Sequence, residues 1–271
     1  MNAAVEVPEE TAAAVDAATA NSTVGPESAE ACSTHVASHA GAAFFCRELQ
    51  SRLPSGSDEP LRLLVAGCGA GHEAAYIRMS FHCTVDAVDI ELYADEHLRA
   101  IEGLNIGVGS VTDLPFADNT FSAVFYHHVI EHVDDPPRSL AEIHRVLRPG
   151  GWLFIGTPNR QRVVSAIGAH QQTDWESTWR NKLRENLQDW SARLRGRFRN
   201  EFGAHAGFSK SELDQLLAKH FPRRDWLTSQ YLRFKYGRSR FAPLLPVVTC
   251  PPVRTFAAPG IYVMSQKGPA S

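Results

Sequence analysis

Three glycines at alternate positions follow the first apolar segment of the chain. Residues 61–66 have the composition of a buried strand and run directly into Gly67, Gly69 and Gly71, after which helical spacing begins. Glycines at this place let the backbone turn tightly and approach a ligand at the carboxyl edge of a parallel sheet. The spacing differs from the G-x-G-x-x-G of dinucleotide-binding sheets, and the sequence has no G-x-x-x-x-G-K-[ST] phosphate loop. The pattern favours a nucleoside without a phosphate chain over NAD or ATP, and the alternative is a turn that binds nothing.

An acidic residue ends the next expected strand. Asp89 lies near the end of residues 84–90, about 20 residues after the glycine loop. A carboxylate in this position accepts hydrogen bonds from ribose hydroxyls. The sequence therefore predicts a ligand with a free ribose.

Three histidines are candidates for acid–base chemistry. His127 and His128 follow the expected strand 122–126, where the carboxyl edge of the sheet meets the ligand cleft. An imidazole there can deprotonate an acceptor near neutral pH. Side chains alternate along a strand, so one of the pair is expected to face the cleft and the other to pack, and His127 is the first choice. His205, between two glycines ahead of a capped helix, is a further candidate, and the alternative for it is a turn residue.

The elements that must position these residues alternate between strand and helix from residue 61 to residue 157. Strands are expected at 61–66, 84–90, 104–109, 122–126 and 151–156, and helices at 72–79, 92–101 and 138–147. A capped helix at 209–219 and strands at 226–236 and 260–266 are expected to follow. This order predicts a Rossmann-like α/β fold, in which helices cover both faces of a doubly wound, mostly parallel seven-stranded sheet.

The charge distribution and the cysteine content limit the classes of protein to which the chain can belong. The chain has a formal net charge of -3, but residues 1–30 alone hold six acids and no Lys or Arg, which predicts a disordered acidic tail. Residues 31–271 are expected to form one domain. No basic leader or run of about 20 apolar residues occurs, so a cytoplasmic protein is expected. The five scattered cysteines predict reduced thiols and no metal site.

A basic segment rich in Trp and Arg interrupts the alternation at about 158–207. One apolar stripe runs along it at helical spacing: Trp175, Trp179, Leu183, Leu187, Trp190 and Leu194. Nine Lys and Arg stand against four acids between residues 160 and 200. We expect a lid helix whose stripe docks on the carboxyl edge of the sheet and whose charged face is solvated. The alternatives are contact with an anionic acceptor or an anionic membrane surface, and nucleic acid is not expected because no RNA-binding motif accompanies the charge.

Five segments resemble, in order, the motifs of class I S-adenosylmethionine-dependent methyltransferases, in particular the small-molecule branch related to UbiE-like enzymes. They are residues 64–71, 88–90, 109–121, 129–133 and 145–152. The resemblance implies an enzyme that uses S-adenosylmethionine and moves a methyl group to a small-molecule, lipid-linked or sugar acceptor by in-line displacement. Two alternatives stay open: a degenerate binding or scaffold protein of the same fold, and a related transfer from a modified donor.

The resemblance also assigns cofactor contacts. The positions are Gly67, Gly69, Gly71, Asp89, Ser110 and Val111. The glycines would lie under the methionine moiety and the aspartate at the ribose. Ser110 stands where the family commonly has an acid for the adenine amine, and Val65 stands where relatives have an acid under the methionine end.

Overall fold

The computed structural model describes residues 39–53, 60–91, 93–94, 96–164, 179–199 and 206–269. The chain divides into two units, Met1–His35 and Val36–Ser271, and every described residue belongs to the second. The predictions for residues 1–30, for Trp175 and for His205 lie outside the described residues. A membrane-spanning helix is absent from the described part of the chain.

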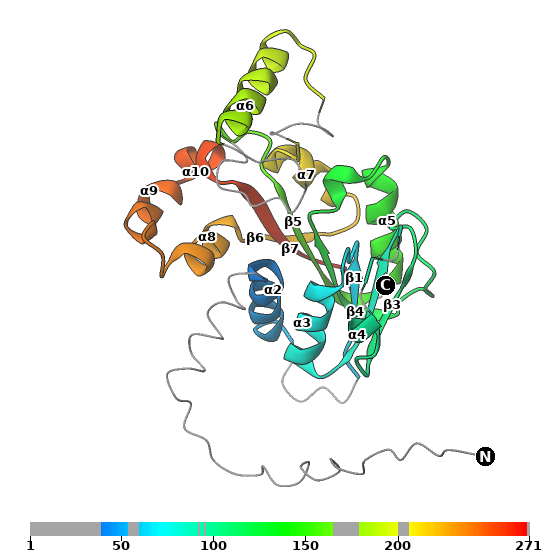
Figure 1. Ribbon diagram of the computed structural model, residues 1–271. Helices are drawn as coiled ribbons and strands as arrows, with labels where there is room; N and C mark the ends of the chain where they lie inside the picture. The colour runs from blue at the N-terminus through cyan, green and yellow to red at the C-terminus, as the bar shows by residue number, and fades with distance from the viewer. Residues whose placement is uncertain are drawn as a thin grey trace, which may run out of the picture. The chain divides into compact units, whose positions relative to one another are not determined.

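A seven-stranded sheet forms the centre of the second unit, in the order β3-β2-β1-β4-β5-β7-β6 (Figure 1). The strands are β1 (Arg62–Ala66), β2 (Thr84–Asp89), β3 (Leu104–Val108), β4 (Phe121–His127), β5 (Leu147–Pro158), β6 (Arg223–Trp226) and β7 (Gly260–Gln266). Strands β1 to β5 run parallel, while β7 runs antiparallel to both β5 and β6. The strand order reverses between β1 and β4, and α/β folds bind ligands at such a switch point. The predicted doubly wound sheet is confirmed.

Strand β1 shows why the sequence forms a sheet that is covered on both faces. Leu63, Leu64 and Val65 are each no more than 2% exposed, as expected of a parallel strand in the middle of a sheet. Because side chains alternate along a strand, Leu63 and Val65 join one hydrophobic cluster and Leu64 joins the other.

Nine α-helices and two 3-10 turns are described around the sheet. The helices are α2 (Ala40–Gln50), α3 (His72–Phe81), α4 (Glu96–Arg99), α5 (Pro136–Val146), α6 (Trp179–Leu194), α7 (Lys210–Leu217), α8 (Thr228–Tyr236), α9 (Leu245–Val248) and α10 (Pro251–Ala257), and the turns are η1 (Ile130–His132) and η2 (Ala242–Leu244). The predicted cap of α7 is present, because Ser209 accepts a hydrogen bond from the backbone of Glu212 while the Glu212 side chain accepts one from Ser209. Helix α5 begins at two prolines behind the Asp135 cap, two residues before the expected start at 138.

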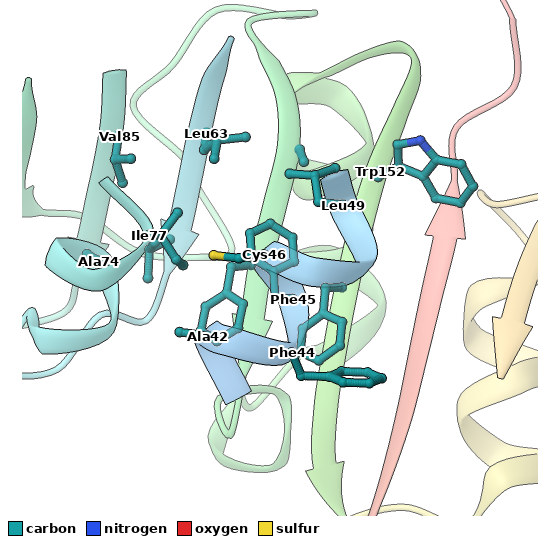
Figure 2. Close-up of a cluster of buried hydrophobic side chains, with 14 of the residues drawn as sticks. Ala42, Phe44, Phe45, Cys46, Leu49, Leu63, Ala74, Ile77, Val85 and Trp152 are labelled. Carbon is teal, nitrogen blue, oxygen red and sulfur yellow. The ribbon is translucent and has the colours of Figure 1, made fainter. Parts of the chain in front are cut away.

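Helix α2 covers one face of the sheet and was not predicted. Phe44, Phe45 and Leu49 are fully buried, and Figure 2 shows them in the same cluster as Ile77 of α3. The Phe45 ring lies 5.2 Å from the ring of Phe125 on β4, measured between centroids. These long-range aromatic contacts hold the helix against the centre of the sheet.

The predicted strand at 226–236 is wrong in most of its length. Only its first residue belongs to β6, and the rest forms α8. Thr228, Tyr231 and Leu232 are buried, at the spacing of three and four residues that places side chains on one helical face. The β-type composition of the segment reflects aromatic packing: the rings of Tyr231 and Phe44 lie edge to face at 5.2 Å.

A helix, α6, is present in the basic segment, but its apolar stripe is not docked on the sheet as expected. Three leucines of the stripe are exposed by 43%, 62% and 87%, namely Leu183, Leu187 and Leu194. Asn186, by contrast, is only 5% exposed. The Trp190 indole N–H donates to the carbonyl of Val163 at 2.9 Å, and Arg193 donates to a carbonyl of the same loop. These polar contacts orient the helix so that its leucines face outward.

The helix ends two residues before Gly196. Helix α6 ends at Leu194, and Gly196 adopts a left-handed conformation with φ of 66°. Its N–H donates to the carbonyl of Arg193 at 3.1 Å, and the N–H of Arg197 donates to the carbonyl of Ala192 at 2.8 Å. This pair of bonds is a Schellman motif, which stops the helix before the last arginines of the segment.

Candidate active site

The glycine loop joins β1 to α3 at the switch point of the sheet. Gly67, Gly69 and Gly71 have φ angles of 77°, 51° and 86°. A Cβ added to Gly67 would lie 2.3 Å from the Val129 side chain, so only glycine fits there. A Cβ on Gly69 would meet no atom within 4 Å. The loop therefore packs against the Val129 side chain at Gly67 and is open at Gly69, where a cofactor would have room to bind.

Asp89 ties the end of β2 to this loop. Its carboxylate accepts hydrogen bonds from the backbone N–H groups of Gly69, at 2.7 Å, and Ile90, at 2.8 Å. A carboxylate offers about four acceptor sites, so it can also accept from two ribose hydroxyls. The predicted ribose residue thus lies directly beside the predicted loop.

The predicted adenine-side residues lie after β3 in two different surroundings. Ser110 closes a local turn, because its hydroxyl lies 2.8 Å from that of Thr112 and accepts from the Thr112 N–H at 3.2 Å. Val111 is 7% exposed and packs in the core, so its side chain faces away from a ligand. Sequence reasoning missed Ile90 and Val108, which are 71% and 62% exposed where β2 and β3 end. Apolar surfaces of this kind can hold the face of an adenine ring.

His127, the first choice from the sequence, is buried. Its side chain is 9% exposed, and a Cβ added to Gly41 or Gly156 would lie 2.4 Å from its ring. Burial lowers the pKa of His127, which keeps the ring neutral at pH 7. Its Nδ1 lies 3.5 Å from a carboxylate oxygen of Glu73 on α3. His127 therefore packs between α2, α3 and β5.

His128 is the histidine whose ring reaches solvent. Its side chain is 49% exposed, and its backbone has a left-handed φ of 57°. The Nδ1 atom lies 3.2 Å from Oε1 of Glu131, whose side chain is only 2% exposed. Thr157, at the end of β5, donates to the other oxygen of Glu131 at 2.9 Å. The backbone turn at His128 thus turns the ring away from the packed position of its neighbour.

The charge on Glu131 determines which nitrogen of His128 can act. Burial favours the neutral acid, but the hydrogen bonds from His128 and Thr157 outweigh it and hold the pKa of Glu131 below its usual range. An ionised Glu131 accepts the hydrogen on Nδ1 of His128, which leaves a lone pair on Nε2. A histidine oriented in this way by a carboxylate can act as a general base. Sequence reasoning missed the roles of Glu131 and Thr157, although Glu131 lies three residues after His128 in a segment that resembled the family.

Comparison with known proteins identifies the domain that holds these features. The family model described as a methyltransferase domain matches residues 64–155, from within β1 through most of β5. Residues 64–155 form a class I S-adenosylmethionine-dependent methyltransferase domain. The resemblance drawn from the five sequence motifs is confirmed.

Relatives of this methyltransferase domain differ in the atom that their names assign as acceptor. The O-methyltransferase resE of Aspergillus sclerotiorum is 32% identical over 116 residues, 40% of this chain and 43% of its own. The ubiquinone/menaquinone C-methyltransferase UbiE of Desulfotalea psychrophila is 48% identical over 50 residues, 18% of this chain and 20% of its own. A glycine/sarcosine/dimethylglycine N-methyltransferase of Actinopolyspora halophila is 27% identical over 184 residues, 65% of this chain and 28% of its own. The matches cover less than half the length of each of these relatives.

A solved structure supports the methyltransferase fold beyond the matched segment. The crystal structure assigned as a sarcosine dimethylglycine methyltransferase from Galdieria sulphuraria superimposes with a TM-score of 0.51 at 14% identity. The superposition covers 84% of this chain and 85% of that chain. At this identity the likeness shows the fold alone.

Proposed function

We propose that the protein transfers a methyl group from S-adenosylmethionine to a small-molecule acceptor, with His128 as the general base. The observation that carries the proposal is the His128–Glu131 pair, which ends β4 next to the glycine loop of a methyltransferase domain. A left-handed φ at a non-glycine residue costs about 1–2 kcal/mol. Such strain concentrates at functional sites, which supports a role for the exposed ring.

Different residues of the chain would bind the cofactor and accept the proton. The loop at Gly69 and the carboxylate of Asp89 would hold the nucleoside, with Ser110 and the backbone of Val111 on the adenine side. When bound, S-adenosylmethionine supplies a methyl group activated by its sulfonium, which moves to the acceptor by in-line displacement. Nε2 of His128 takes the proton from the acceptor hydroxyl or amine, and the ionised Glu131 stabilises the imidazolium that forms.

We also propose that the acceptor is anionic and binds beside the segment at 158–207. This segment would be an insertion within a methyltransferase domain that spans residues 31–271. The exposed side chains of Arg195, Arg197 and Arg199 follow or end α6 and carry the positive charge that attracts a phosphate or carboxylate. The same amphipathic segment supports a peripheral contact with an anionic membrane. A cytoplasmic location is part of the proposal, because the four described cysteines are free thiols.

Titration calorimetry and a metabolite comparison test this function. The protein is expected to bind S-adenosylmethionine and S-adenosylhomocysteine and to ignore NAD. Mass spectra of a cell extract incubated with and without the protein should show a pair of ions about 14 Da apart, the mass of one methylene added to an acceptor. Binding of NAD in place of the sulfonium donor would refute the proposal. Cofactor binding without any methylated product would favour the degenerate scaffold.

A further inference from the structure

Exposed large hydrophobic side chains gather in one part of the described structure. Of the fifteen such residues, eleven lie in the loop after β5, on α6 and from Phe241 to α10. We call these eleven the apolar rim: Val163, Val164, Leu183, Leu187, Trp190, Leu194, Phe241, Leu244, Val247, Val253 and Phe256. Scattered exposed hydrophobics are ordinary, but a gathered set marks a contact surface.

Hydrogen bonds join the two halves of the apolar rim. The Trp190 indole of α6 donates to the carbonyl of Val163 at 2.9 Å. The N–H of Val163 donates to the carbonyl of Phe256 on α10 at 2.8 Å. Helix α6 and helix α10 are therefore neighbours on either side of one residue, as Figure 1 also shows. Helices α9 and α10 and the turn η2 continue the surface along the chain.

Helix α6 exposes its apolar face and buries a polar residue, which is the opposite of a helix that packs on a protein core. Leu183, Leu187 and Leu194 share one face by their spacing and are exposed by 43%, 62% and 87%. The polar Asn186 is only 5% exposed. Removing a leucine side chain from water is stabilising, and in the described part of the chain this face stays largely exposed to solvent. It is free-standing apolar surface available to a partner.

Positive charge surrounds this apolar surface. Residues 179–199 and 233–256 together contain twelve Lys and Arg and two acids, in a chain whose net charge is -3. After Asp225 the sequence has no acidic residue. On α6 a hollow with Leu187 in its wall is lined by Arg184, Arg195 and Arg197. A basic, leucine- and aromatic-bearing surface complements an anionic bilayer, where apolar groups enter the acyl boundary and arginines meet lipid phosphates.

We propose that the apolar rim docks on an anionic lipid bilayer. The proposal deepens the membrane contact of the proposed function, because it adds η2, α9 and α10 to the segment indicated by the sequence. The loop that joins the two halves leaves the end of β5, beside Thr157 and the His128–Glu131 pair. Docking there would bring the acceptor side of the cleft to the membrane surface, where a lipid-linked acceptor is held.

Vesicle sedimentation with the full chain tests the proposal without any methyl transfer. Vesicles of phosphatidylcholine alone are compared with vesicles containing about one-third phosphatidylglycerol, at low and high salt. The protein is expected to bind the anionic vesicles at least about tenfold more tightly, with a loss of binding at high salt. Leu187→Ser with Leu194→Ser should weaken binding about tenfold or more. Arg238→Gln with Arg240→Gln should weaken it about 25-fold, at about fivefold for each cation near the surface.

The matched control is Met79→Ser on α3, which is 67% exposed and lies outside the apolar rim. It should bind vesicles like the parent. Equal binding by the parent, the rim variants and the control, or no binding to anionic vesicles, would overturn the proposal. A dimer in analytical ultracentrifugation that Leu187→Ser with Leu194→Ser abolishes would assign the surface to a second copy of the chain instead. Calorimetry with S-adenosylmethionine on the same samples keeps the two proposals separate, since cofactor binding does not depend on lipid.

Discussion

Replacing Glu131 by Gln removes the negative charge beside the proposed base, His128, with little change in the shape of the side chain. The carboxylate is buried, and it holds His128 at 3.2 Å and Thr157 at 2.9 Å. A hydrogen bond to a charged group contributes about 1.5–3 kcal/mol, and one between neutral groups about 0.5–1.5 kcal/mol. The variant should therefore lose about 1–1.5 kcal/mol of stabilisation of the imidazolium, which lowers kcat about five- to twelvefold.

The affinity for S-adenosylmethionine and the tautomer of the His128 ring distinguish an orienting role of Glu131 from a merely structural one. The affinity for S-adenosylmethionine, measured by calorimetry, should stay unchanged, because Glu131 makes no contact with the glycine loop or Asp89 among its described hydrogen bonds. Nitrogen-15 NMR of His128 should show the hydrogen on Nδ1 in the parent and a mixture of tautomers in Glu131→Gln. The control is Glu142→Gln on α5, whose carboxylate pairs with Arg145. Unchanged kcat together with an unchanged tautomer would refute the assignment of His128 as an oriented base.

The same variant has a predictable effect on stability in acid. Because the folded pKa of Glu131 is held below 4.5, the stabilisation it provides is fully present above about pH 4.5 and is lost as pH falls through the lowered value. Glu131→Gln should remove that part of the pH dependence. Thermal melts between pH 3 and pH 6 measure it, and parallel curves for the parent and the variant would contradict the low pKa.

Three further predictions concern the cofactor loop and the basic segment. Asp89→Ala should weaken S-adenosylmethionine binding by about 1.5–3 kcal/mol in calorimetry, and unchanged affinity with an unchanged melting curve would mean that the side chain does not face the ligand. Gly67→Ala should destabilise the fold by more than about 2 kcal/mol, since its Cβ overlaps a valine as well as forcing alanine into a left-handed φ. Gly69→Ala should destabilise it less, by about 1–2 kcal/mol for a left-handed φ alone, and should reduce cofactor affinity; equal melting temperatures for the two would refute this distinction. Arg197→Gln with Arg199→Gln should raise the acceptor KM in a salt-dependent way and leave cofactor affinity unchanged. Equal acceptor kinetics of the variant and the parent at low salt would mean that the two arginines do not contact the acceptor.

The positions of the proposed cofactor residues could be predicted from the sequence because the signals are local. A strand of continuous apolar residues, the glycines that follow it and the acid at the end of the next strand are close in sequence. The structure places Gly69 and Asp89 in direct hydrogen-bond contact. Periodicity alone was enough to find β1 to β5 and β7.

The remaining features depend on contacts between distant residues. Strand alternation predicts that one of His127 and His128 faces the cleft, but the left-handed φ of His128 decides which one. Helix α2 is held by rings far along the chain, such as Phe125. The aromatic composition of 226–236 is typical of a strand, yet Tyr231 packs as part of a helix.

The pairing of β5 with β7 sets a limit on how the chain can be cut. Seven residue pairs, from Trp152–Gln266 to Pro158–Gly260, join the two strands. A fragment trimmed to the family match at 64–155 would lose β7 and leave β5, a long apolar strand, with an unpaired edge. It would also lose Phe44 and Phe45, and with them the cover over one face of the sheet. Exposed strand edges recruit other chains, so such a fragment should aggregate, and expression trials need the sequence from α2 through β7.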